Sequence, residues 1–345
     1  LASEIAAQRG EVGSAVTTYL AMARETRDPR LARRATELAL GERALGPAMQ
    51  AAALWHELEP GSALAAQTLE TLWLSTGRLD DAEPLMRARL QRARAAGTLP
   101  EAYSQIQRVL ERASDKTGAL AMLQRLAAPD ARVPEARMAL ASQASAADDP
   151  ELSAREAAAA VGLAPGDESI VVPAAQYIAQ GEGGLDRAVA LLKGFLDGHP
   201  KAIEARFALA RLLAGAERDD AAREQFELAL EQDPQSPVIL FSLAQLAWQT
   251  KHPEAAEQYL RRYLDLPADV QRDDGPAWLF LGQIAESQGR TDAAIERYGK
   301  VQRGEQYVPA VIRRALLMAR SGRVGEARQS LHDAFVTSNR ERVQL

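Results

Sequence analysis

The chain has no cysteine, few aromatic residues and a single asparagine among its 345 residues. Without cysteine it can form no disulfide, no thiolate zinc site, no iron–sulfur cluster and no cysteine nucleophile. No uninterrupted apolar run approaches the roughly eighteen residues that a membrane-spanning helix requires. The formal net charge of −6 has the wrong sign for a protein that binds nucleic acid or anionic lipid through its overall charge.

Alanine and leucine are abundant, and clusters of strand-forming residues are nearly missing, which predicts helices along almost the whole chain. Length alone predicts about two domains. An internal period changes that expectation, because Pro165, Pro200 and Pro234 are 35 and 34 residues apart and each ends an amphipathic stretch. A period near 34 residues is typical of the tetratricopeptide repeat, a pair of antiparallel helices.

The repeat places small residues at its eighth, twentieth and twenty-seventh positions, a large residue at the twenty-fourth and often proline at the thirty-second. Small residues let the two helices cross closely, and the large residue fills the gap beside them. Proline ends the second helix, because its ring disfavours a helical preceding residue and its nitrogen cannot donate. Residues 203–236 match at all five positions, with Ala210, Ala222, Phe226, Ala229 and Pro234.

The same spacing, extended outward, predicts about ten units. In chain order they are 1–28 (partial), 29–62, 63–99, 100–133, 134–168, 169–202, 203–236, 237–274, 275–308 and 309–342. No unit can bury its apolar face alone, so we expect one all-α tetratricopeptide superhelix, an α-solenoid, over residues 1–345. Two stretches, Arg92 to Pro100 and Leu266 to Pro276, are longer than an ordinary turn between units. We expect solvated insertions there, with hinges or protrusions as the alternative.

The sequence predicts neither an enzyme nor a cofactor or metal site. The four histidines fall in different units and form no His-Glu-x-x-His pair: His56, His199, His252 and His332. The glycine-rich stretch at Gly181, Gly183 and Gly184 lacks the Gly-Lys-Ser/Thr ending of a phosphate-binding loop. No Gly-x-Ser-x-Gly elbow is present.

The first helix of each repeat lines the concave side of such a superhelix and presents its second, fifth, ninth and twelfth positions there. The residues at these positions predict a protein-binding groove: Tyr177, Phe207, Arg211, Phe241, Gln245, Trp248, Leu279 and Gln283. Buried aromatic and arginine side chains supply much of the energy of protein binding. The alternative is that Phe207, Phe241 and Trp248 belong partly to the core. A chaperone-type carboxylate clamp is not expected, because it needs asparagine on first helices and the one asparagine is Asn339.

The opening residues carry a more specific pattern. The run ASEIAAQRG (Ala2 to Gly10), the helix with Tyr19 and the run ARETRDPRLARRATELAL (Ala23 to Leu40) resemble the start of the tetratricopeptide outer-membrane lipoproteins of Gram-negative bacteria. The distinctive match covers about a tenth of the chain. The resemblance implies a periplasmic array held at the outer membrane by a lipidated cysteine. It also implies an adaptor that binds a carboxyl-terminal processing protease and presents peptidoglycan hydrolases to it.

The sequence begins at Leu1 rather than methionine, so we expect a processed or truncated chain, and any signal peptide or lipidated cysteine would lie upstream of Leu1. The predicted function is a non-enzymatic scaffold for other proteins, without nucleic acid and with membrane contact only through such an anchor. Two alternatives stay open. The chain could serve another envelope or cytosolic assembly machine, or it could be the regulatory repeat region of a larger enzyme.

Overall fold

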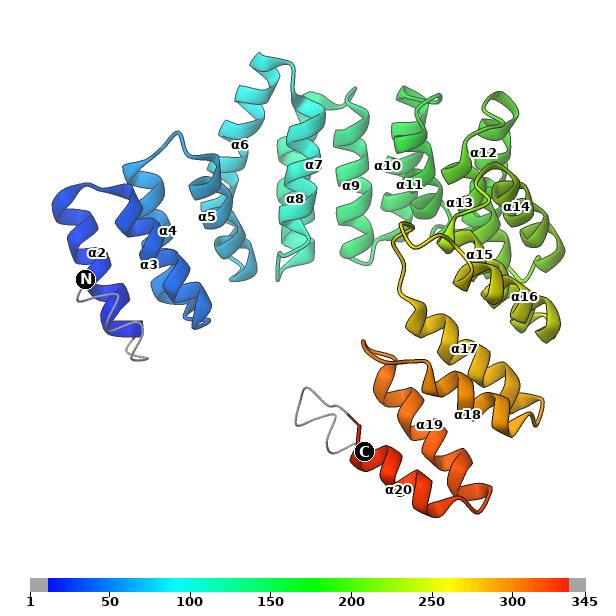
Figure 1. Cartoon of the computed structure of the whole chain (residues 1–345). Coiled ribbons are helices and arrows are strands. Elements are labelled where there is room, and N and C mark those ends of the chain that lie inside the picture. The colour runs from blue at the N-terminus through cyan, green and yellow to red at the C-terminus, as the bar shows by residue number, and fades with distance from the viewer. Residues whose placement is uncertain (1–11, 335–345) are drawn as a thin grey trace. The chain divides into compact units, whose positions relative to one another are not determined.

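The computed structural model describes residues 12–334, which form helices α2 to α20 with short turns and no β-strand in that range (Figure 1). Within each unit, most helices that follow one another in the chain pack side by side. The predicted all-α fold of antiparallel helix pairs is confirmed. None of the helices in the described range is long and apolar enough to cross a membrane.

The chain divides into two compact units between Phe195 and Leu196, inside α12 (Gly184–Gly198). The first unit contains α2 to α11. Their bounds are α2 Val12–Thr26, α3 Pro29–Gly41, α4 Leu45–Leu58, α5 Ala63–Ser75, α6 Leu79–Ala96, α7 Leu99–Leu110, α8 Lys116–Ala127, α9 Pro134–Ala146, α10 Pro150–Leu163 and α11 Glu168–Ile178. A single 3-10 turn, η1, spans Ala128–Asp130.

The second unit contains α13 to α20. Their bounds are α13 Ile203–Gly215, α14 Asp219–Gln232, α15 Pro237–Gln249, α16 Pro253–Leu264, α17 Asp274–Ser287, α18 Thr291–Gly299, α19 Tyr307–Arg320 and α20 Val324–His332. Within this unit the strongest packing joins α13 to α14, α15 to α16, α17 to α18 and α19 to α20. These pairs place α13, α15 and α17 as successive first helices.

The close crossing of α17 and α18 shows why a small residue stands at the eighth repeat position. A Cβ atom added to Gly282 on α17 would lie 2.3 Å from the ring of Tyr298 on α18. Tyr298 is buried, and its hydroxyl donates a hydrogen bond of 2.6 Å to Glu286 Oε2. Glycine at one position and a large ring at the other therefore fit together as a matched pair.

The turn inside most helix pairs contains one residue in the left-handed region. Glycine takes this place at Gly77, Gly289 and Gly322, with φ between 70° and 80°. Other residues take it elsewhere, namely Arg43, Asp148, Glu217 and Lys251, with φ between 56° and 61°. The turn geometry thus recurs even where the sequence lacks the glycine that favours it.

The two stretches flagged as insertions differ in the structure. The first prediction is wrong, because residues up to Ala96 continue α6, Gly97 ends the helix with φ 72°, and α7 begins at Leu99. The alanines and arginines of this stretch are good helix formers, which extends the helix into it. The second stretch contains a true loop of residues 265–273 between α16 and α17. We call this segment the 265–273 loop.

Candidate protein-binding groove

Three first helices of the second unit carry seven of the eight predicted groove residues. Phe207 and Arg211 are one turn apart on α13, so they share a helix face. The remaining five lie on the next two first helices: Phe241, Gln245 and Trp248 on α15, and Leu279 and Gln283 on α17. The eighth residue, Tyr177, lies half-buried on α11 in the first unit.

Two adjoining pockets bring these seven residues together. The first, called the proximal pocket, has a volume of about 550 Å³ and is lined by α13, α15 and the 265–273 loop, with Phe207, Arg211 and Phe241 in its wall. The second, called the distal pocket, has a volume of about 340 Å³ and lies between α15 and α17. Trp248, Leu279 and Gln283 line only the distal pocket. Phe241, Gln245 and Pro276 line both pockets, which therefore form one surface.

A series of aromatic contacts supports this surface. The rings of Phe207 and Phe226 are 5.5 Å apart in an edge-on arrangement. Phe241 lies 5.9 Å from Tyr263 and 6.0 Å from Phe280, and Phe280 lies 6.0 Å from Trp248. Phe207, Phe241 and Trp248 are all half-buried. Each ring therefore contacts other side chains of the repeats and also lines a pocket, which fixes its orientation before any partner binds.

The groove also contains residues that the sequence did not predict: Tyr263, Phe280 and residues 271–273 of the 265–273 loop. Tyr263 lies on a second helix and Phe280 at the sixth position of a first helix, outside the four groove positions of the repeat. The unusual length of the 266–276 stretch was a signal that something differed there. Its composition of Gly, Pro and Asp could not show which way the loop folds.

Arg272 holds the 265–273 loop against the groove. Its guanidinium donates to Asp274 Oδ1 at 2.8 Å and to the carbonyl oxygens of Pro267 and Leu264, both at 3.0 Å. The same group lies 6.0 Å from the ring centre of Tyr263, a cation–π distance. The hydroxyl of Tyr263 donates to the backbone carbonyl of Asp273 at 2.8 Å. The loop is thus a wall of the proximal pocket, fixed by side-chain contacts.

The proximal pocket has more positive than negative side chains, and these side chains differ in whether they already have hydrogen-bond partners. Its lining contains two arginines, Arg211 and Arg272, and one carboxylate, Asp273. Asp273 accepts a hydrogen bond of 2.9 Å from the amide of Gly275 and so caps α17. Arg272 is engaged as described, whereas Arg211 is exposed and makes no hydrogen bond or ion pair to the described residues. Arg211 is therefore the cation free to meet a ligand.

A buried carboxylate joins α16 to the next helix pair. Glu257 is only 8% exposed and accepts hydrogen bonds of 2.7 Å from both Arg261 and Arg290, with a further bond from Arg297. Burial raises the pKa of Glu257, but the hydrogen bonds from Arg290 and Arg297 outweigh it and lower the pKa to about 2. The network stabilises the junction between the repeats that carry the groove.

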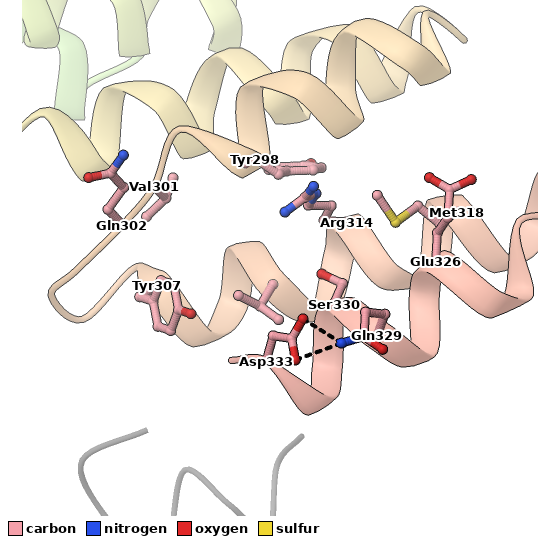
Figure 2. Close-up of a pocket in the computed structure, with 12 residues that line it drawn as sticks. Tyr298, Val301, Gln302, Tyr307, Arg314, Met318, Glu326, Gln329, Ser330 and Asp333 are labelled. Atoms are coloured by element: carbon pink, nitrogen blue, oxygen red, sulfur yellow. Dashed lines mark hydrogen bonds between the residues drawn. The ribbon is translucent and has the colours of Figure 1, made fainter. Parts of the chain in front are cut away.

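A third cavity, of about 480 Å³, lies among α18, α19 and α20 and contains none of the predicted groove residues (Figure 2). Its lining is mixed, with Tyr298, Arg314 and Met318 opposite polar side chains of α20. Figure 2 shows Gln329 donating to both carboxylate oxygens of Asp333, at 2.8 and 2.7 Å. This pairing engages both carboxylate oxygens of Asp333 within α20 and the residue that follows it.

Metal-binding side chains do not cluster in residues 12–334, where no three His, Cys, Asp or Glu residues come together. What the groove offers is aromatic surface, amide groups and one free guanidinium. These groups can bind a polypeptide through apolar contacts and hydrogen bonds.

Sequence comparison identifies the repeat directly. Tetratricopeptide-repeat models match residues 179–237, 220–284 and 275–303. Residues 179–303 carry tetratricopeptide repeats. The matched repeats contain every groove helix of the second unit, from α13 to α17. Tetratricopeptide repeats form protein-binding scaffolds, so this part of the sequence prediction is confirmed.

A comparison with curated proteins finds no match. Among solved structures the chain is similar to PilW, a type IV pilus biogenesis factor, with 17% identity, 60% of this chain and 96% of that chain covered, and a TM-score of 0.47. It is similar to PilF of Pseudomonas aeruginosa, with 16% identity, coverage of 64% and 97%, and a TM-score of 0.45. YrrB, a tetratricopeptide protein with an unusual peptide-binding site, gives 21% identity, coverage of 52% and 91%, and a TM-score of 0.40. None of these likenesses assigns a partner to this chain.

Proposed function

We propose that this chain is a non-enzymatic adaptor that holds a segment of a partner protein in the groove formed by α13, α15 and α17. One observation carries the proposal: seven residues chosen from repeat positions line two adjoining pockets that share Phe241 and Gln245. Half-buried aromatic rings lose their remaining water contact when a partner covers them, and such residues dominate binding energies.

The finer proposal is a periplasmic adaptor, tethered by a lipid anchor upstream, that binds a carboxyl-terminal processing protease and brings peptidoglycan hydrolases to it. It rests on the resemblance of the opening residues, of which Ala2 to Gly10 lie outside the described range. Such an adaptor needs no chemistry of its own. Holding protease and client together raises their effective concentration, and cleavage accelerates for that reason.

The first test of both proposals is an affinity capture from a solubilised bacterial envelope fraction, with bound proteins identified by mass spectrometry. The bait is the wild-type chain, the groove variant Phe207→Ala/Phe241→Ala, or the control Leu316→Ala/Val324→Ala. Leu316 and Val324 are exposed apolar side chains on α19 and α20 that line none of the pockets described here. We expect the wild type and the control to retain the same proteins and the groove variant to lose one of them.

Recovery of a processing protease with cell-wall hydrolases supports the finer proposal, and faster hydrolase cleavage in the presence of the chain would complete it. Equal cleavage rates with and without the chain would remove that version. Equal retention by all three baits would remove the groove as the binding surface. Recovery of assembly-machine proteins alone would favour a scaffold of such a machine.

A further inference from the structure

We infer that the proximal pocket selects a partner segment in which a large apolar side chain is closely followed by an acidic residue, Asp or Glu. The inference deepens the proposed function and rests on it. It concerns which ligand the proximal pocket of the groove recognises.

The apolar half of the pocket is formed by Phe207, Phe241 and Tyr263, with Pro237 and Val238 on the same wall. Val238 is 60% exposed and lines the same cavity. A ligand side chain in this cavity of about 550 Å³ would remove Val238 and the three rings from water. Apolar burial on this scale favours a large ligand residue such as Leu, Met or Phe.

The charged half of the pocket has one free group. Arg211 follows Phe207 by one helical turn, so its guanidinium lies beside the apolar cavity. Arg272 is engaged with Asp274 and two backbone carbonyls, and Asp273 caps α17. A ligand carboxylate next to the apolar side chain would therefore accept hydrogen bonds from Arg211. A ligand cation at the same place would be repelled by the positive charge of Arg211.

The remaining polar groups of the pocket suit an extended backbone. Ser242, Gln245 and Gln271 also line the cavity. An amide side chain can donate to a peptide carbonyl and accept from a peptide N–H, so it can follow a main chain without selecting side chains. The net charge of −6 makes a polyanion such as nucleic acid a poor occupant of the groove as a whole.

The test begins with a phage-displayed library of random peptides panned against the full chain. The baits are the wild type, Arg211→Glu and the control Arg328→Glu. Arg328 is exposed on α20, lines neither groove pocket and gives the same change in net charge. We expect wild type and control to enrich a large apolar residue followed within two positions by Asp or Glu. Arg211→Glu should lose the acidic preference.

The most enriched peptide is then synthesised with a fluorescein label and titrated by fluorescence anisotropy. Replacing its acidic residue by the neutral amide should weaken binding to the wild type by about tenfold, the usual effect of one charge-assisted hydrogen bond. Arg211→Gln should weaken the parent peptide by a similar factor. A peptide with Lys in place of the acid should bind Arg211→Glu better than it binds the wild type.

The outcomes separate this inference from the proposed function. Peptides without an acidic preference, or the same preference on Arg211→Glu, overturn the inference while leaving a protein-binding groove. The same holds if panning enriches nothing although the capture experiment loses a partner with Phe207→Ala/Phe241→Ala. If enriched peptides bind equally well to that groove variant, both the inference and the groove are wrong.

Discussion

At the scale of single residues, two buried carboxylates show opposite pKa shifts because they have different numbers of partners. Glu257 is surrounded by three arginines, and its pKa falls to about 2. Glu70 on α5 is 1% exposed and pairs with Arg89 at 2.5 Å. Burial raises the pKa of Glu70 to about 7, with Arg89 opposing the shift only in part. Glu257 therefore stabilises the folded protein as an anion, whereas the folded protein is more stable when Glu70 is protonated.

We expect Glu257→Gln to lower the free energy of unfolding by about 2 to 3 kcal/mol at pH 7. The folded pKa lies below the ordinary value of 4.5, so the stabilisation is present above pH 4.5 and is lost as the pH falls toward 2. Urea denaturation from pH 7 down to pH 3.5 should show the gap between wild type and variant closing. Glu231→Gln is the control, since Glu231 is exposed on α14. A gap that stays constant with pH would contradict the network.

Glu70→Gln should behave in the opposite sense. The folded pKa of about 7 lies above the ordinary value, so wild-type stability falls as the pH rises from about 5 to 8. The variant lacks this titration, and its stability relative to wild type should rise by about 2 kcal/mol over the same range. Urea midpoints at pH 5 and pH 8 measure the effect. An unchanged difference between the two proteins would show that Glu70 titrates normally.

At the scale of elements, the distance between paired helices depends on single atoms. Gly282→Ala places a methyl group against the Tyr298 ring, and we expect a loss of about 2 kcal/mol as α17 and α18 move apart. Gly194→Ala is the matched control, because nothing lies within 4 Å of its added Cβ in α12. That substitution should raise stability by about 0.5 to 1 kcal/mol. Thermal and urea denaturation compare the two, and equal effects would argue against the close crossing.

The 265–273 loop is the element whose order depends most on one side chain. Arg272→Ala removes three hydrogen bonds and the contact with the Tyr263 ring. We expect a modest loss of stability, about 1 kcal/mol, with faster cleavage by thermolysin between residues 265 and 273 and weaker groove binding. Arg303→Ala, at an exposed position before α19, should change neither. Unchanged cleavage of the Arg272 variant would show that the backbone alone holds the loop.

At the scale of the whole molecule, contacts run mainly between helices that are neighbours in the chain. In such arrays a local change weakens its own repeat and the adjoining ones. Hydrogen exchange of Gly282→Ala should therefore rise in α16 to α19 and stay at the wild-type rate in α3 and α4 of the first unit. An equal increase along the whole chain would indicate one cooperative fold instead.

The fold and much of the candidate groove followed from sequence because a repeat constrains both. Ala210 and Gly282 occupy the position where a helix pair needs a small residue, and Phe226 occupies the position where it needs a large one. The regular spacing of such residues therefore predicts the fold. Phe241 and Gln245 were chosen from their position in the repeat, and both line the two pockets. Tyr263 and Arg272 were not, because their roles depend on the path of a loop that no period describes. The prediction of an insertion at Arg92 to Ala96 was wrong for a simpler reason. It gave more weight to the nearby glycine and proline than to the helix-forming alanines and arginines of the stretch itself.

The recurring left-handed turn has a consequence for heat tolerance. Arg43, Asp148, Glu217 and Lys251 adopt a backbone conformation that costs side-chain-bearing residues about 1 kcal/mol each. Glycine adopts it without that strain in the turns at Gly77, Gly289 and Gly322, although glycine loses more chain entropy on folding. None of these four residues lines a groove pocket. The melting temperature of this array is therefore lower than the same fold permits. Replacing the strained turn residues by glycine would raise it without any change in the helices.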